Sequence, residues 1–246
     1  MVNMEVCANS VSSALAAEAG GAIRVELCDN LPEGGTTPSY AQIKLAKKVL
    51  TIDLYPIIRP RAGDFIYSDL EFELMKEDIA VCRALNCNGV VLGILTAEGT
   101  VDMVRCQELI ELARPMGVTF HRAFDMCKDL NQALEDIIAL GCERILTSGA
   151  EASAMRGASA IRMLVEKAAG RISIMAGAGV SITNIGSLIR ETGVAEFHAS
   201  ARNRVESKMQ FRNPRLSMGT EGDEFGYSPT STEIVKKLIE LANQSS

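Results

Sequence analysis

The chain of 246 residues contains no tryptophan, and aromatic residues make up only 4% of it. Proteins that bind nucleic acid usually rely on aromatic stacking and on an excess of basic charge. This chain has 25 lysines and arginines against 31 aspartates and glutamates, so its formal net charge is −6. Both features argue against nucleic acid and against an anionic membrane surface as partners.

Long apolar runs and export signals are also missing. The longest apolar stretch, around Val90–Leu95, is far too short to cross a bilayer. The first residues show neither the basic nor the apolar region of a secretory signal. The seven cysteines include no CxxC pair, which argues against a zinc ribbon and a redox dithiol. Free thiols without a signal are typical of a reducing compartment, so we expect a cytoplasmic protein.

The chain does contain eight short apolar runs, and each is followed by a helix-like stretch. Strands that alternate with helices pair in parallel, and a (β/α)8 barrel, or TIM barrel, has roughly 250 residues. No linker-like segment divides the chain before Ser200. We therefore predict one domain over residues 1–246, with eight parallel strands ringed by helices. The predicted strands are Met4–Ala8, Ile23–Leu27, Leu54–Ile58, Gly89–Leu92, Val118–His121, Arg144–Thr147, Ile172–Ala176 and Glu196–Ala199.

One long polar segment, 203–231, breaks this pattern after the eighth strand. Loops beyond about 12–15 residues are uncommon and are usually functional or disordered. We predict an extended loop or arm at 203–231 and a C-terminal helix at 232–243. The arm could cover the barrel mouth, contact a neighbouring subunit or form a mobile tail.

Two helix starts are also predicted, because Asp69 and Ser181 each offer a side-chain acceptor just before a helical period.

The alternation of side chains along each strand predicts which residues face the barrel axis. The aliphatic face should pack on the helices, because a charge buried beneath them would be unpaired and costly. The predicted interior then contains Glu5, Cys7, Arg24, Glu26, Cys28, Arg59, His121, Glu196 and His198. Among these, we expect Glu5, Arg24 and Glu196 to form ion pairs at the barrel bottom.

Candidate catalytic residues lie at the downstream ends of the strands, where this fold places its active sites. Glu26, His121 and His198 fall there, and the chain has only two histidines. Glu26 with either histidine would form a titratable pair for acid–base chemistry, such as proton abstraction beside a carbonyl. The residues alone leave open whether the protein is an enzyme.

Candidate anion-binding residues follow the seventh and eighth strands, in the loops that often bind phosphate in this fold. The stretch AGAGVS supplies Gly177 and Gly179, and HASAR supplies Ser200 and Arg202. Arg59 and Arg61 could face the anion from across the mouth. The alternative interpretation is that the glycines only form a turn and that the arginines are solvated.

A metal site is the third possibility. Cys7 and Cys28 lie on neighbouring predicted strands with the same parity, and two thiolates at close range suit copper(I). A buried cysteine is also a common packing residue, which is how we interpret the other five.

The motifs EVCANS, RVELCDNLPEGGTTPS, PIIRPRAGDFIYS, GVVLGILTAEGTVD, VTFHRAFDM, RILTSG and IMAGAGV together resemble the CutC family. The resemblance extends from Glu5 to about Arg202. It implies a cytoplasmic (β/α)8 barrel assigned to copper homeostasis, with copper(I) binding and a homo-oligomer, such as a dimer, expected. Cys7 and Cys28 match positions that could serve copper. The family-typical residues at the barrel mouth are Glu26, Asp29, Arg59, Arg61, His121, Arg122, Asp125 and His198.

Two functions remain open at this point. The first is a copper(I)-handling protein that uses Cys7 and Cys28. The second is an enzyme with lyase-type or isomerase-type chemistry on a small anionic or phosphorylated carbonyl compound. The second interpretation accounts better for the arginines and carboxylates at the mouth, because soft copper does not need them.

Overall fold

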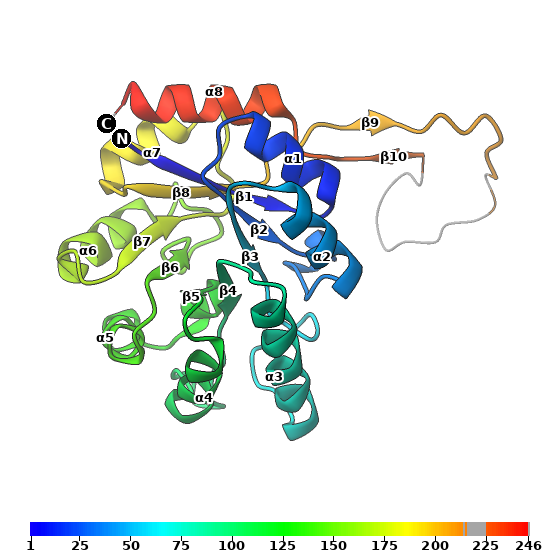
Figure 1. The fold of residues 1–246 in the computed structure, drawn as a ribbon. Coiled ribbons are helices and arrows are strands. Elements are labelled where there is room, and N and C mark those ends of the chain that lie inside the picture. Colours follow the sequence, from blue (N-terminus) through cyan, green and yellow to red (C-terminus); the bar gives the residue numbers. More distant parts are fainter. Residues whose placement is uncertain (214, 216–224, 246) are drawn as a thin grey trace.

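A computed structural model describes residues 1–213, 215 and 225–245 of the chain. Eight strands form one parallel sheet in the order β3-β2-β1-β8-β7-β6-β5-β4 (Figure 1). A parallel bridge between Ile57 and Val91 joins the two edge strands and closes the ring. The prediction of a (β/α)8 barrel is therefore confirmed. The strands are β1 Asn3–Ala8, β2 Arg24–Leu27, β3 Asp53–Pro56, β4 Gly89–Leu92, β5 Gly117–Phe120, β6 Arg144–Thr147, β7 Ser173–Ala176 and β8 Glu196–Ala199.

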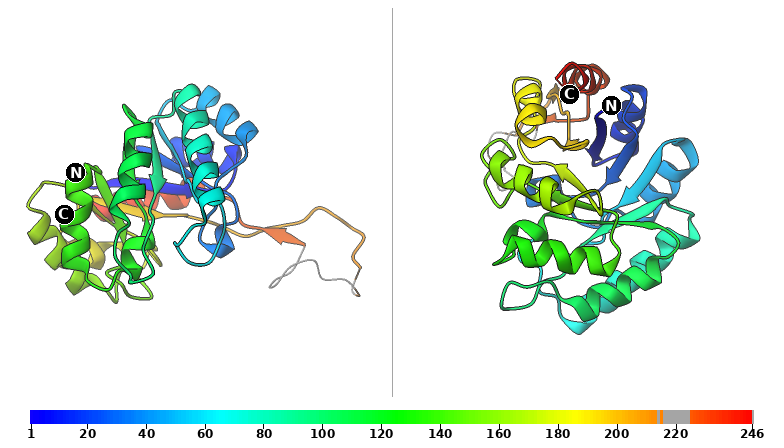
Figure 2. Two further views of the ribbon diagram at one scale, coloured as in Figure 1. Left: turned by 90° about the horizontal axis from the view of Figure 1, so that it is seen from below. Right: turned by 90° about the vertical axis from the view of Figure 1, so that its left-hand side faces the viewer.

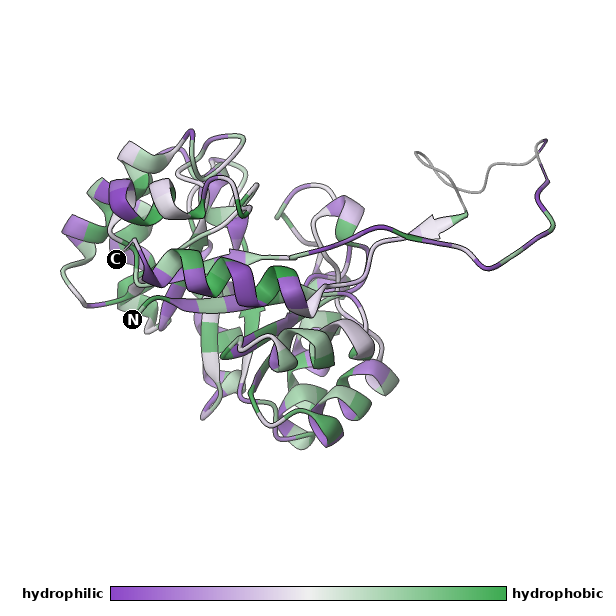
Figure 3. Ribbon diagram, turned by 90° about the horizontal axis from the view of Figure 1, so that it is seen from above, coloured by the Kyte–Doolittle hydropathy of each residue, from purple (hydrophilic) through white to green (hydrophobic). Residues whose placement is uncertain are grey.

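Helices surround this barrel, as the two further views in Figure 2 show. The last helix, α8, returns beside α1 and α7, and Val2 donates its backbone N–H to the Asn243 side chain over 2.8 Å. Figure 3 shows hydrophobic and hydrophilic bands alternating along α8, as expected of a helix with one buried face. The helices are α1 Val11–Ala19, α2 Tyr40–Val49, α3 Asp69–Ala84, α4 Met103–Ala113, α5 Leu130–Leu140, α6 Ala158–Ala168, α7 Ile185–Thr192 and α8 Thr232–Asn243, with short 3-10 turns η1 at Leu31–Glu33 and η2 at Arg122–Met126.

The two predicted helix starts were wrong by one and three residues. Ser68 caps α3, because its side chain accepts from the backbone of Glu71 while the Glu71 carboxylate accepts from the backbone of Ser68. Asn184, rather than Ser181, precedes α7, and it makes no side-chain cap bond. No helix in the described part of the chain has the length and hydropathy needed to cross a membrane.

The apolar core is divided into two parts by the strands. The larger part fills the space between the sheet and the helices and includes Val6, Leu54 and Phe197. The smaller part lies inside the barrel and consists of Cys7, Cys28, Tyr55, Ile57 and Val91, with Leu31 against it. The predicted alternation of inward and outward residues is confirmed, since Val6 and Cys7 fall in different parts.

The bottom of the barrel is held by buried ion pairs. Arg24 Nε lies 2.5 Å from Glu5 Oε2, and the same guanidinium also pairs with Glu196. Arg144, which the sequence did not single out, pairs with Glu196 from the opposite side, with Nε 2.7 Å from Oε2. The expected ion pairs of Glu5, Arg24 and Glu196 are therefore present, with Arg144 as a fourth member.

The segment after β8 forms an arm. Two short strands, β9 Val205–Glu206 and β10 Gly226–Tyr227, pair in antiparallel fashion, and an Arg202–Thr230 bridge closes the base. Figures 1 and 2 show the arm extending away from the barrel. Its predicted span includes residues 214 and 216–224, which lie outside the described residues.

Candidate functional site

A cavity of about 660 Å³ opens at the downstream ends of the strands. Ligand pockets commonly have volumes of about 300–1,000 Å³, so this one is large enough for a small organic molecule. Many of the predicted site residues line it, together with Phe65 and Glu33, which the sequence did not suggest. The predicted residues among its lining are Cys7, Glu26, Arg59, His121, Arg122, Asp125, Gly179, His198, Ser200 and Arg202.

Strand register brings three side chains with potential metal-ligand atoms together on the floor of this cavity. In the parallel pairing, Cys7 of β1 lies opposite Glu26 of β2, and Glu5 lies opposite His198 of β8. Each of Cys7, Glu26 and His198 offers one potential ligand atom, and these three atoms lie within 4.8 Å of one another. Cys28, just past β2, adds a second thiol, with its Sγ 3.4 Å from that of Cys7.

The His198 ring is held by two carboxylates. Its Nδ1 lies 2.8 Å from Glu5 Oε1, and its Nε2 lies 3.6 Å from Glu26 Oε2. Burial disfavours the charged imidazole, but the hydrogen bond to Glu5 and the charge of Glu26 outweigh it and raise the pKa of His198. With Nδ1–H donated to Glu5, Nε2 is turned toward Glu26, and a ring nitrogen lies within 4.8 Å of the Cys7 sulfur. This carboxylate–histidine arrangement is the one that commonly orients a metal ligand.

Glu5 remains ionised although it is fully buried. Burial alone would raise the pKa of Glu5, but the hydrogen bond to His198 and the charge of Arg24 lower it to about 2. Glu5 therefore acts as the hydrogen-bond acceptor for both of these residues. The ion pairs at the barrel bottom thus continue upward into the cavity floor.

Two other groups on the floor have raised pKa values. The hydrogen bond to Cys28, burial and the nearby Glu26 charge raise the pKa of the Cys7 thiol. Burial, followed by the charge of Glu5, raises the pKa of Glu26 against the opposing effect of His198. A bound cation would relieve this concentration of acidic groups and replace their protons.

Arg59 forms part of the cavity wall and is buried, with 5% of its surface exposed. Its guanidinium donates to the carbonyl oxygens of Glu33, Gly35 and Gly63 over 2.8–2.9 Å and stacks 5.1 Å from the centroid of Phe65. Within the described residues, no carboxylate lies at ion-pair distance from Arg59, and its Nε has no hydrogen-bond partner. The positive charge therefore faces carbonyl dipoles and the Tyr67 hydroxyl rather than an anion.

His121 lies next to Arg59 and is held in one tautomer. Its Nδ1 accepts the backbone N–H of Ala123 over 3.2 Å, while Nε2 has no partner in the described part of the chain. Burial and the Arg59 charge lower the pKa of His121 to about 3. The ring is therefore neutral at physiological pH, and its hydrogen is on Nε2.

Polar side chains form the rim of the cavity. Asp125 pairs with Arg122 over 2.8 Å and accepts the hydroxyl of Thr147 over 2.5 Å. Arg202 Nε donates to Ser200 Oγ over 3.2 Å. Arg122 and Asp125 follow β5, Ser200 and Arg202 follow β8, and Thr147 is the last residue of β6.

Four predicted site residues do not line the cavity. Arg61 is turned to the surface, where it pairs with Asp64 and Glu71. The Asp29 side chain accepts from Gln42 over 3.1 Å. Gly177 makes room for its neighbours, since a Cβ there would lie 3.3 Å from His198 Cβ and closer still to Leu146. Cys28 is fully buried behind Cys7.

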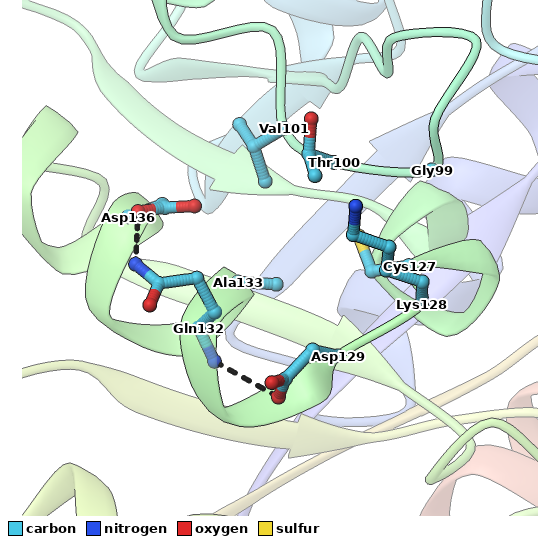
Figure 4. A pocket seen from close by; sticks show the side chains of 9 residues that line it. All are labelled: Gly99, Thr100, Val101, Cys127, Lys128, Asp129, Gln132, Ala133 and Asp136. Carbon is cyan, nitrogen blue, oxygen red and sulfur yellow. Dashed lines mark hydrogen bonds between the residues drawn. The ribbon is translucent and has the colours of Figure 1, made fainter.

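A second, smaller pocket of about 130 Å³ lies away from the mouth, beside the start of α5 (Figure 4). Several of its polar groups already have partners within the protein. Asp129 accepts two backbone N–H groups at the start of α5, and Gln132 donates to Asp136 over 2.9 Å. We therefore assign it no functional role.

The family model and two similar relatives indicate the same protein family. The model of the CutC family matches residues 2–203. A protein of Chromobacterium violaceum named as a family protein CutC is 52% identical over 243 residues, which are 98% of each chain. A relative of the same name from Parabacteroides distasonis is also 52% identical over 239 residues, which are 96% of this chain and 98% of the relative.

Solved structures give the same fold. The structure of CutC from Streptococcus agalactiae, described as a candidate copper homeostasis protein, is 38% identical. It has a TM-score of 0.78 and covers 81% of this chain and 99% of its own. Phosphoribosylanthranilate isomerase from Thermotoga maritima is 13% identical with a TM-score of 0.60, covering 99% of this chain and 100% of its own. At such low identity, the second likeness concerns the barrel alone.

Proposed function

Since this chain belongs to the CutC family, we propose that it binds copper(I) on the floor of its mouth cavity. Cys7 and Cys28 supply two thiolates, and His198 supplies its Nε2 as a third ligand. The observation that carries the proposal is the 3.4 Å separation of the Cys7 and Cys28 sulfur atoms, together with the ligand atoms of Glu26 and His198 within 4.8 Å of that of Cys7.

The chemistry of the ligands selects a soft monovalent ion. Thiolates favour copper(I) over hard cations such as magnesium and calcium, which prefer oxygen. Glu5 supports the site from behind, because it accepts the Nδ1–H of His198 and leaves Nε2 free for the metal. Copper binding would release the proton of the Cys7 thiol, whose pKa is raised by the hydrogen bond to Cys28, by burial and by the Glu26 charge.

The cytoplasm is the compartment that suits this site. Copper(I) and free thiols both persist under reducing conditions. Cysteine side chains occur here as free thiols in the outer core as well as at the mouth. We therefore propose a cytoplasmic protein that receives copper through its open cavity.

The test is an anaerobic titration with copper(I) against a competing chelator. Wild type should bind one copper(I) per chain, and Cys7→Ser and Cys28→Ser should each lose most of the affinity. Cys106→Ser is the matched control, because Cys106 is equally buried but lies in the outer core. Unchanged affinity in the Cys7→Ser/Cys28→Ser double variant would refute the proposed site.

A second candidate function is acid–base catalysis on a small anionic or phosphorylated carbonyl compound. It is favoured by the 3.6 Å contact between Glu26 and His198 in a cavity far larger than a bare ion needs. In this reaction, the Glu26 carboxylate takes a proton from the carbon beside the carbonyl, and the C–H electron pair moves into an enolate. The proton then returns from Glu26 to carbon, as in an isomerase.

Hydrogen exchange in D2O tests this second function without knowledge of the natural substrate. Wild type should catalyse deuterium incorporation beside the carbonyl of some 2-oxo acid or phosphorylated hydroxyketone, and Glu26→Gln should abolish it. Glu33→Gln is the control, because Glu33 also lines the cavity. No exchange above background across such a panel, or full exchange in Glu26→Gln, would exclude the mechanism.

A further inference from the structure

We propose that Arg59 and His121 form an oxyanion-binding subsite on the wall of the mouth cavity. Its ligand is the carboxylate or phosphate group of a small organic molecule. The biological role of this subsite rests on the second candidate function. The subsite would bind the anionic group of the substrate in that reaction. It needs neither the thiol pair nor a bound metal.

The charge of Arg59 is the first reason. A buried charge is costly unless it is paired, and the buried arginines at the barrel bottom follow this rule. Arg24 and Arg144 both pair with Glu196, whereas Arg59 meets carbonyl oxygens and has no carboxylate partner in the described residues. A ligand anion would supply the missing charge.

The free hydrogen on His121 is the second reason. Because Nδ1 already accepts from Ala123, the neutral ring has only a donor to offer at Nε2. A metal ion would need a lone pair at this nitrogen, but an oxyanion needs the hydrogen. A buried donor without a partner is costly, so this position favours a ligand oxygen.

The ring of His121 is also held in place by its surroundings. Gly93 at the end of β4 leaves room for it, since a Cβ there would lie 2.7 Å from Nδ1. The Phe65 ring packs against His121 at 5.0 Å and against the Arg59 guanidinium at 5.1 Å. Phe65 lines the cavity beside both residues.

The chain has only two histidines, which makes the subsite directly observable by NMR. We would titrate the full-length protein with inorganic phosphate and, separately, with succinate at constant ionic strength. Imidazole ¹⁵N–¹H spectra should show a saturable shift of the His121 Nε2–H signal, with the tautomer unchanged. A response to phosphate alone indicates a phosphorylated ligand, and a response to succinate alone indicates a carboxylic acid.

Two substitutions at position 121 distinguish loss of the Nε2 hydrogen-bond donor from a general effect on folding. His121→Asn retains an acceptor near Nδ1 but removes the Nε2 donor, so affinity should fall roughly tenfold or more. His121→Gln places an amide donor near Nε2, and its anion affinity should stay within about threefold of wild type. Because the His121 ring signal is lost in these variants, their affinity is read by calorimetry, with thermal unfolding as a check on folding.

Arg61→Gln is the matched control, because Arg61 lies two residues from Arg59 but outside the cavity. It should bind both anions like wild type, whereas Arg59→Gln should not. Anion binding is read by NMR and calorimetry without turnover, which separates this subsite from the acid–base step. The proposal is overturned if neither anion produces a saturable His121 shift, if His121→Asn binds like wild type, or if Arg61→Gln weakens binding as much as Arg59→Gln.

Discussion

At the scale of single residues, Glu5 connects the stability of the barrel with its chemistry. One carboxylate oxygen pairs with Arg24, and the other accepts from His198. Loss of a carboxylate that orients a metal-binding histidine typically costs 10–100-fold in metal affinity. Glu5 is thus a positioning residue in the proposed copper site.

We predict that Glu5→Gln weakens copper(I) binding about 10–100-fold in the chelator competition. The reason is that a neutral amide no longer favours the tautomer that leaves Nε2 free. Glu196→Gln is the control, since Glu196 pairs with Arg24 but does not contact His198. Equal losses in both variants would show that general loosening of the barrel, rather than the orientation of His198, is responsible.

His121 should make stability depend on pH. The pKa of its folded form is about 3 against 6.5 for an ordinary histidine, so the folded state binds fewer protons than the unfolded state. This contribution to stability is complete above pH 6.5 and is lost as pH falls from 6.5 towards 3. The slope approaches about 1.4 kcal/mol per pH unit for one proton.

His121→Asn should remove this slope. We expect urea denaturation to show wild type losing stability relative to the variant between pH 6.5 and pH 4, while other groups contribute equally to both proteins. A constant difference between the two proteins across this range would contradict a neutral, buried His121.

Sequence reasoning at this scale found the inward side chains but not all of their contacts. Alternation alone identified Cys7, Glu26 and His198, because parity depends only on position along a strand. It placed Glu5 at the barrel bottom and missed its bond to His198, because that contact depends on the register between β1 and β8. Arg59 and Arg61 have the same parity, yet both follow the end of β3, and the chain bends after Arg59 so that Arg61 turns to the surface.

At the scale of secondary-structure elements, buried ion pairs hold neighbouring strands together. Arg24 of β2 reaches Glu5 of β1 and Glu196 of β8. Removing one partner of such a network leaves a buried charge without compensation.

We predict that Arg24→Leu lowers the free energy of unfolding by about 3–5 kcal/mol. Arg171→Leu should have a much smaller effect, because Arg171 and Glu135 form an exposed pair. Denaturant melts of the two variants against wild type test this contrast. A loss of similar size in both would mean that the buried network contributes no more than a surface pair.

The elements themselves were largely predictable, because alternating strand and helix periods are strong signals. The exact ends of the helices and strands were less predictable. The start of α3 depends on reciprocal bonds between Ser68 and Glu71. The sequence alone offers Asp69 as an equally plausible cap. The bounds of the arm strands were not predictable either, since β9 and β10 are two residues each and pair only with one another.

At the scale of the whole molecule, the arm carries apolar side chains away from the barrel. Met209, Phe211 and Tyr227 are 61%, 75% and 63% exposed. Exposed apolar side chains gathered on one projection suggest a protein contact. We propose that the arm contacts a second copy of this chain in a homo-oligomer, such as a dimer.

Deletion of residues 205–227, with a short Gly-Ser replacement, should then convert the assembly to monomers. Sedimentation velocity would show a fall in the sedimentation coefficient beyond the loss of mass. Substitution of Met209 and Phe211 by serine should give the same result with the arm intact. An unchanged assembly in both variants would exclude this role for the arm.

The whole cavity combines a floor of thiols and carboxylates with a wall that carries a buried arginine and a neutral histidine. The central claim is that copper(I) binds to the sulfur atoms of Cys7 and Cys28 on that floor. X-ray absorption spectroscopy of the protein loaded with one copper(I) per chain tests this claim most directly. The account predicts two sulfur neighbours per copper in wild type and none in the Cys7→Ser/Cys28→Ser variant. A copper shell of nitrogen and oxygen alone, or a sulfur shell that survives in that variant, would contradict it.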